Sequence, residues 1–184
     1  QLKEGEKASQ LLTQTDVMPL ENFWVEINAE GFISRTEDDK PNRLGGENAP
    51  WSILRTNSHQ TLFLVTPEGQ AAAIHMLSIP VQRGEEPTTP VHKLSPLSED
   101  EVVQAAFAIP IEKNDIGERY VLTVTRQGMV KKSLVTELPG ASANRFTLVK
   151  VNEGDELFRV LLTDGKKEVL LTTAKGMSIR FSET

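Results

Sequence analysis

A hairpin pattern that occurs four times constrains the fold of this chain more than any other feature of its sequence. The copies span residues 23–35, 62–74, 121–133 and 169–181, and each centres on a glycine: Gly31, Gly69, Gly128 and Gly176. In every copy an apolar and β-branched run is followed by a polar residue, the glycine and a second run. Self-similarity at a period of roughly 40 to 50 residues is typical of propeller-type arrays.

The chemistry around each glycine is also repeated. A polar residue followed by glycine predicts a two-residue primed hairpin turn, because such turns need positive φ angles. Three positions before the glycine stands a threonine or an asparagine: Asn28, Thr66, Thr125 or Thr173. Four positions after it stands a cation in three copies, Arg35, Lys132 and Arg180, whereas the remaining copy has Ala73.

A second unit lies between the hairpins. Polar clusters at 97–102 and 151–157 lead into apolar runs at 102–109 and 157–162. We interpret each cluster as a turn and each run as a buried strand, so that one period holds about four strands, the content of one propeller blade. The sequence therefore predicts an all-β, propeller-like array of four-stranded blades over residues 19–184, with about three to four blades. Residues 1–18 are predicted to be a linker or amino-terminal extension, with a short helix around residues 8–12.

Charge is distributed unevenly along the chain. The net charge is −6, which argues against indiscriminate binding of nucleic acid. Residues 1–115 carry 9 basic and 18 acidic side chains, whereas residues 116–184 carry 11 basic and 8 acidic ones. The second part therefore has the charge to face DNA. No apolar run approaches the roughly 20 residues that a membrane span needs, and the absence of cysteine excludes disulfides, thiolate metal sites and cysteine nucleophiles.

Several motifs resemble one known family. They are Val-Asn-Glu-Gly-Asp-Glu-Leu at 151–157, Leu-Leu-Thr-Asp-Gly at 161–165, Lys-Gly-Met-Ser-Ile-Arg-Phe-Ser-Glu at 175–183 and Thr-Arg-Gln-Gly-Met-Val-Lys-Lys-Ser at 125–133. These look like the repeats of the carboxy-terminal domain of the gyrase A protein, part of the bacterial type IIA topoisomerase DNA gyrase, and the similarity covers about residues 20–184.

The resemblance implies a β-pinwheel, in which neighbouring blades exchange strands. It also implies a module that wraps double-stranded DNA around a basic rim and has no catalytic centre or cofactor of its own. In the whole cytoplasmic, nucleoid-associated enzyme, the gyrase B protein joins the rest of gyrase A in an A2B2 assembly. ATP and Mg are used elsewhere in that assembly to introduce negative supercoils.

One segment departs from the family pattern. The basic, glycine-rich heptapeptide of the first blade corresponds to residues 42–48, where Arg43, Gly45 and Gly46 are retained but Glu47 stands where a cation is expected. The preceding residues 37–39 are acidic. A degenerate heptapeptide also occurs in the corresponding protein of topoisomerase IV, so that paralogue is an alternative. A propeller that binds protein instead of DNA is a second alternative.

The repeat and the resemblance together predict the DNA-contacting residues. The hairpin repeat brings one set of cations to equivalent places, where they can contact phosphates without reading sequence. The alternative role is that of solvated charges that keep edge strands soluble. The predicted set is Arg35, Arg43, Gly45, Gly46, Arg126, Lys131, Lys132, Arg145, Lys175 and Arg180.

Other chemistries find little support in the sequence. His59, His75 and His92 have no metal-ligand spacing, and no nucleophile-elbow motif accompanies them. We expect neither a catalytic residue nor a metal site. The aromatic residues, Phe23, Trp24, Trp51, Phe63 and Phe181, are predicted to pack in the core rather than to stack on single-stranded bases.

Overall fold

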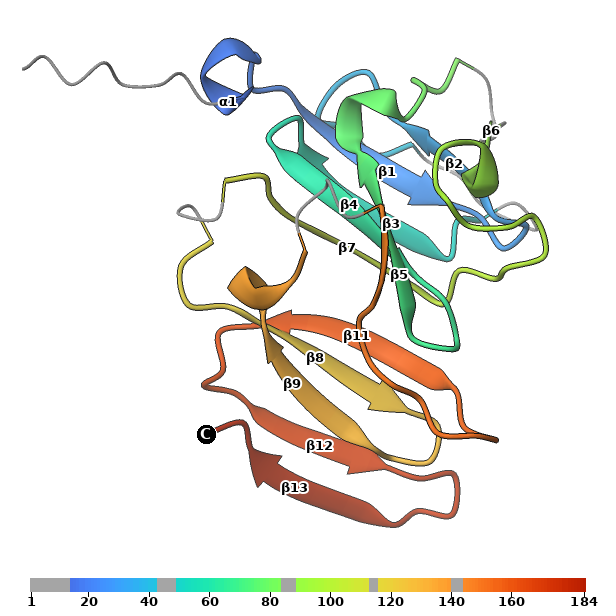
Figure 1. The fold of residues 1–184 in the computed structure, drawn as a ribbon, viewed down its shortest axis with the longest axis vertical. Helices are drawn as coiled ribbons and strands as arrows, with labels where there is room; N and C mark the ends of the chain where they lie inside the picture. Colours follow the sequence, from blue (N-terminus) through green and yellow to red (C-terminus); the bar gives the residue numbers. More distant parts are fainter. Residues whose placement is uncertain (1–13, 43–48, 84–88, 113–115, 140–143) are drawn as a thin grey trace, which may run out of the picture.

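The computed structural model describes residues 14–42, 49–83, 89–112, 116–139 and 144–184. Within these ranges it contains one short helix, α1 (Gln14–Val17), and three 3-10 turns, η2 (Met76–Ser78), η3 (Val91–Lys93) and η5 (Val135–Glu137). All other regular structure is β-strand, in four antiparallel sheets stacked along the long axis of the molecule (Figure 1). The all-β prediction is confirmed, whereas the helix predicted around residues 8–12 lies outside the described residues.

The four predicted hairpins are all present, each in a sheet of its own, and we call these sheets blades one to four. In chain order the hairpins are β1 (Asn22–Ile27) with β2 (Phe32–Arg35), β4 (Gln60–Val65) with β5 (Gln70–His75), β8 (Tyr120–Thr125) with β9 (Val130–Leu134), and β12 (Glu168–Thr172) with β13 (Ser178–Ser182). The repeat in the sequence is therefore a repeat in space.

The turns of these hairpins differ from the predicted two-residue primed type. Gly128 has φ of +85° and no non-glycine residue among those described has positive φ, so Gln127 does not supply the second positive φ of a type I′ turn. The Gly128 N–H donates to the carbonyl of Thr125 and the Thr125 N–H donates to the carbonyl of Met129. This is the pattern of a three-residue loop with glycine in the left-handed bulge position. The repeated polar residue stabilises it, because Thr125 Oγ1 accepts the Met129 N–H at 3.1 Å.

Strand exchange joins the blades. Blade one has the order β3 (Ser52–Asn57), β1, β2, β6, and blade two has the order β10, β5, β4, β7 (Ala105–Pro110). Both β6 (Thr89–Pro90) and β10 (Arg145–Thr147) follow the next hairpin along the chain and then return to the previous blade. Blades one and two are thus each completed by residues that come after the hairpin of the next blade, as expected of a β-pinwheel.

The first three blades each have one further strand on the opposite edge of the sheet. These strands are β3 (Ser52–Asn57), β7 (Ala105–Pro110) and β11 (Leu157–Thr163), which lie beside one another at the centre of the stack. We call the other edge, formed by β6, β10, β9 and β13, the rim. Among the described residues blade three has three strands and blade four has two, so the prediction of four strands holds for blades one and two only.

Two apolar cores fill the spaces between successive blades. Leu62 and Leu64 of β4 point into the core shared with blade one, and Phe63 and Val65 point into the core shared with blade three. All four side chains are fully buried, so β4 is apolar on both faces because both faces are covered. Phe63 stacks on Phe107 at a centroid distance of 5.3 Å. Burial of this kind supplies the main stabilisation of the stack.

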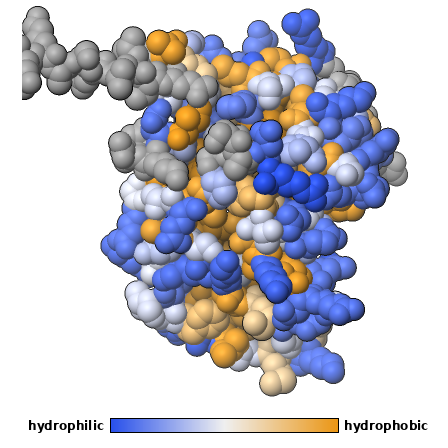
Figure 2. Space-filling model, in the orientation of Figure 1, coloured by the Kyte–Doolittle hydropathy of each residue, from blue (hydrophilic) through white to orange (hydrophobic). Residues whose placement is uncertain are grey.

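Two predictions about apolar residues are wrong. The run at 157–162 is a strand, β11, but only Leu157 is buried, and Leu161 is 53% exposed because it lines an open groove beside blade four. Trp51, predicted to pack in the core, is 41% exposed, whereas Phe23 and Phe63 are buried as predicted. Hydrophobic side chains also reach the surface at the lower end of the molecule (Figure 2), where blade four exposes Leu170, Met177 and Ile179.

Candidate nucleic-acid interface

The cation that the hairpin repeat carries occupies one equivalent position in three blades. Arg35, Lys132 and Arg180 stand opposite Val25, Leu122 and Leu170 in their hairpins. The exception, Ala73, stands opposite Phe63, which is the corresponding position of blade two. The register thus brings the repeated cation to the same place on the second strand of each hairpin, as the sequence predicts.

Two of these cations, Arg35 and Lys132, differ in what they contact. Arg35 is half-buried, donates from Nε to the carbonyl of Ile79 at 3.0 Å and lies 4.9 Å over the ring of Phe23. Lys132 is exposed, lies 4.7 Å over the ring of Tyr120 and donates to the carbonyl of Glu183. Arg35 therefore braces blade one internally, and Lys132 remains accessible from the rim.

Lys131 points to the opposite face of β9 from Lys132, as alternate residues of a strand must. It lines a cleft of about 210 Å³ together with Lys150, Asn152 and Asp155. Burial alone would raise the pKa of the Asp155 carboxyl, but hydrogen bonds from Thr125 and from the N–H groups of Glu156 and Gln127 together lower it. Sequence reasoning missed Lys150, because it lies outside the hairpin repeat and only the folded chain brings it beside Lys131.

Three of the predicted arginines are held by carboxylates. Arg126 Nε donates to Glu156 Oε2 at 2.9 Å, and both Nε and Nη2 of Arg180 donate to Glu168 Oε2. Arg145 pairs with Glu101, 44 positions away in the sequence. The hairpin repeat in the sequence could have predicted the Glu168–Arg180 pair, because the hairpin register makes these two residues diagonal neighbours. No local pattern predicts the Arg145 pair.

The Arg145–Glu101 pair is bidentate. Arg145 Nη1 donates to Glu101 Oε2 at 2.9 Å and Nη2 donates to Oε1 at 2.6 Å. The hydrogen bond from Arg145 is the main cause that lowers the pKa of the Glu101 carboxyl, and the same hydrogen bond raises the pKa of Arg145. Glu101 Oε2 also accepts the N–H of Ser98 at 2.7 Å. The pair therefore fixes a loop to the rim strand β10.

Lys175 lies in the hairpin turn of blade four and is exposed. Its side chain makes no hydrogen bond or ion pair with any other residue that the structure describes, and the same is true of Lys131. Four of the predicted cations lie on rim strands: Lys131, Lys132, Arg145 and Arg180.

The start of the predicted heptapeptide is anchored in blade one. Asn42 donates from its backbone N–H to Glu26 Oε1 at 3.1 Å and from Nδ2 to Glu26 Oε2 at 3.3 Å. Glu26 is fully buried, so these bonds replace water around its carboxyl group. In the acidic stretch before Asn42, Asp39 forms a bidentate pair with Arg55, which lowers the pKa of Asp39 through the hydrogen bond. Arg43, Gly45 and Gly46 lie outside the described residues.

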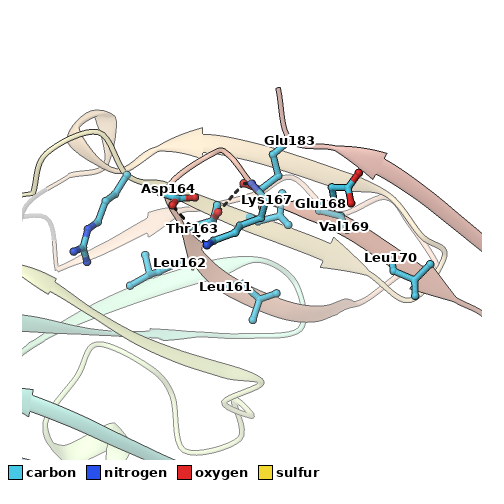
Figure 3. A pocket seen from close by; sticks show the side chains of 11 residues that line it. Leu161, Leu162, Thr163, Asp164, Lys167, Glu168, Val169, Leu170 and Glu183 are labelled. Atoms are coloured by element: carbon cyan, nitrogen blue, oxygen red, sulfur yellow. Dashed lines mark hydrogen bonds and ion pairs between the residues drawn. The ribbon is translucent and has the colours of Figure 1, made fainter.

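A groove of about 520 Å³ separates blades three and four (Figure 3). Leu161, Leu162 and Leu170 line it, and one end is closed by polar side chains, where Thr163 Oγ1 donates to Glu183 Oε2 at 2.6 Å. The described residues hold no group of three or more histidine, cysteine or acidic side chains that fits a metal ion. His59 is held by the carbonyl of Met18, 2.7 Å from its Nε2. In the ranges that the structure covers, no helix has the length and apolarity to cross a membrane.

Comparison with known proteins finds a similar family for part of the chain. Residues 119–164 and 167–184 match the family described as DNA gyrase C-terminal domain, beta-propeller. The matched residues cover blades three and four, so this part of the chain is similar to the repeats of that family. It is 27% identical over 195 residues to the DNA gyrase A protein of Streptococcus pyogenes serotype M1, and 27% identical over 181 residues to that of Halalkalibacterium halodurans. The first comparison covers all of this chain and the second covers 92% of it. The chain spans only 23% of the length of the first relative and 21% of the length of the second.

Solved structures share the fold of this chain. The crystal structure of the C-terminal domain of DNA topoisomerase IV aligns with 91% of this chain and 53% of its own, with 25% identity and a TM-score of 0.69. The E. coli ParC C-terminal domain aligns with 89% of this chain and 65% of its own, with 15% identity and a TM-score of 0.71. The structure of a DNA gyrase A C-terminal domain aligns with 88% of this chain and 55% of its own, with 20% identity and a TM-score of 0.62.

Proposed function

We propose that this chain is a non-catalytic module that binds and bends double-stranded DNA for a bacterial type IIA topoisomerase. The observation that carries the proposal is the match of residues 119–164 and 167–184 to the gyrase A carboxy-terminal repeats. That match falls on the part of the chain that carries a net charge of +3. A similarity to a family that wraps DNA and a segment of net positive charge point to the same partner.

The rim supports this function physically. Lys131 and Lys132 lie on opposite faces of the rim strand β9, Lys150 lines the same cleft as Lys131, and Lys175 is exposed in the hairpin turn of blade four. Lysine ammonium groups at such positions contact phosphate oxygens without reading bases, so binding is weakly selective for sequence. Because the blades are stacked along an axis, successive contacts follow a path around the rim, and the cost of bending makes binding depend on the deformability of the DNA.

In the whole enzyme this module would support ATP-dependent negative supercoiling. The proposed partners are duplex DNA, the rest of the gyrase A protein and the gyrase B protein, in an A2B2 assembly located in the bacterial cytoplasm. ATP and Mg would act in other parts of that assembly. We favour gyrase over topoisomerase IV because the relatives described above, from Streptococcus pyogenes and Halalkalibacterium halodurans, are both gyrase A proteins.

The first test is binding of this chain to a duplex of about 40 base pairs across a salt series, with circularisation of a short fragment as the readout of bending. We expect affinity to fall steeply with salt and circularisation to rise with protein concentration. Absence of binding at low salt would contradict the proposal and favour a propeller that binds protein, to which the acidic residues 1–115 are suited.

The second test locates the contact. The double variant Lys131→Glu, Lys132→Glu removes two phosphate contacts, so the log–log salt slope should become shallower by about 2. Thermal stability should change little, because both side chains are exposed. The control is Lys3→Glu, Lys7→Glu in the predicted linker, which makes the same change of net charge. Equal loss of affinity in both double variants would show that only net charge matters and would refute the rim contact.

A further inference from the structure

The three arginines that pair with carboxylates are held to very different degrees. In the Arg126 and Arg180 pairs both side chains are more than half exposed, and each arginine uses a single carboxylate oxygen. In the Arg145–Glu101 pair the side chains are 37% and 20% exposed, and both carboxylate oxygens are engaged. Exposed pairs with one acceptor are weak in water, whereas a bidentate arginine–carboxylate pair is among the stronger charged contacts.

Arg145 lies where a DNA contact would be expected. It is the first residue of β10, the rim strand that completes blade two, and it stands opposite Ala72 of β5. Besides the two bonds to Glu101, its Nη1 donates to the carbonyl of Pro96 at 3.4 Å. Three of the four terminal N–H groups of the guanidinium therefore donate to groups of the protein itself.

We propose that Glu101 limits the DNA affinity of this chain, because its carboxylate pairs with the Arg145 guanidinium and takes the place of a DNA phosphate. This inference rests on the proposed function. A carboxylate and a phosphate both present paired oxygens that match the planar fork of arginine, so they compete for the same donors. Arg126 and Arg180, by contrast, can exchange their exposed carboxylates for phosphates at little cost. Glu101 is therefore an affinity-determining residue at the rim.

The test compares two neutralising variants in one loop, Glu101→Gln and Glu99→Gln. Both change the net charge by the same amount, but Glu99 is exposed and makes no hydrogen bond or ion pair with another described residue. Glutamine at 101 keeps an oxygen that accepts the Ser98 N–H, so the loop retains that bond. Affinity is measured with the duplex of about 40 base pairs across the salt series described above.

We expect Glu101→Gln to raise DNA affinity about three- to tenfold at low salt and to steepen the log–log salt slope by about 0.9, the value of one added phosphate contact. Glu99→Gln should change affinity by less than about twofold, and Arg145→Ala added to Glu101→Gln should abolish the gain. Equal effects of Glu101→Gln and Glu99→Gln, or a gain that persists without Arg145, would overturn the inference. Failure of the unaltered chain to bind DNA would instead contradict the proposed function.

Discussion

Alanine at Gly69 should destabilise the fold far more than alanine at Gly128, although both glycines close equivalent hairpins. Their φ angles are +78° and +85°, so each substitution forces an L-residue into the left-handed region. That strain costs about 1–2 kcal/mol, and restriction of the unfolded chain returns about 0.4–1 kcal/mol. At Gly128 a Cβ would meet nothing within 4 Å, so we expect a net loss of about 1 kcal/mol for Gly128→Ala.

At Gly69 the chain that connects blades two and three lies directly on the turn. A Cβ there would be 2.1 Å from the carbonyl oxygen of Val149 and 2.9 Å from its Cγ1. The N–H groups of Leu148 and Val149 donate to the Gly69 carbonyl at 2.9 and 3.3 Å. Moving this segment aside would weaken two hydrogen bonds worth about 1 kcal/mol each. The expected loss for Gly69→Ala is therefore about 3 kcal/mol.

Thermal unfolding followed by circular dichroism provides the assay. At about 2–4 °C per kcal/mol for a chain of this size, Tm should fall by roughly 2–4 °C for Gly128→Ala and by roughly 6–12 °C for Gly69→Ala. Subtracting one Tm shift from the other cancels the cost of placing alanine in the left-handed region, which is the same in both variants. Equal shifts of Tm would refute the conclusion that the blade connection packs against the turn at Gly69.

Two further predictions concern buried and paired carboxyl groups. Asn42→Ala removes the Nδ2 hydrogen bond to the buried Glu26 carboxyl and leaves the bond from the backbone N–H, so it should cost about 1–3 kcal/mol of unfolding free energy, measured by urea denaturation. Asn42→Asp, which places a second carboxylate there, should cost more, and an unchanged midpoint in either variant would contradict the contact. Because the folded pKa of Glu101 is lowered from 4.5, its pair with Arg145 stabilises the fold above pH 4.5, and that contribution is lost as the pH falls through the lower folded pKa. Glu101→Gln should therefore flatten the fall of Tm below pH 4.5, and parallel acid curves would refute the assignment.

Much of the fold could be predicted from the sequence, because its hairpins are local. A glycine with a threonine or asparagine three positions earlier fixes each turn within a few residues. Burial was harder to predict. The runs Leu-Phe-Leu-Val in β4 and Val-Leu-Leu in β12 look alike in sequence, yet β4 is covered on both faces and Leu170 of β12 is 65% exposed. Whether an apolar strand is buried depends on which sheets stack beside it, and that is a property of the assembled chain.

The candidate site was predicted less completely. The equivalence of Arg35, Lys132 and Arg180 follows from the repeat, since the hairpin register preserves spacing. Their partners do not follow from it, because contacts such as Arg145 with Glu101 join segments that are distant in sequence. The two-residue strand β6 is also too short to carry a pattern of its own, so the strand exchange could be expected only from the family resemblance.

Strand exchange also determines the order in which the blades can be completed. Blade one receives β6 only after the hairpin of blade two has been made, and blade two receives β10 only after the hairpin of blade three. Contacts between segments so distant in sequence form late, because the intervening chain must be ordered first. The ribosome delivers the chain from its amino terminus. Blades one and two can therefore be completed only after the hairpin of the next blade has been synthesised. Until β6 or β10 joins, the adjacent hairpin strand, β2 or β5, is an unpaired edge, and the nascent chain is open there to pairing with other strands.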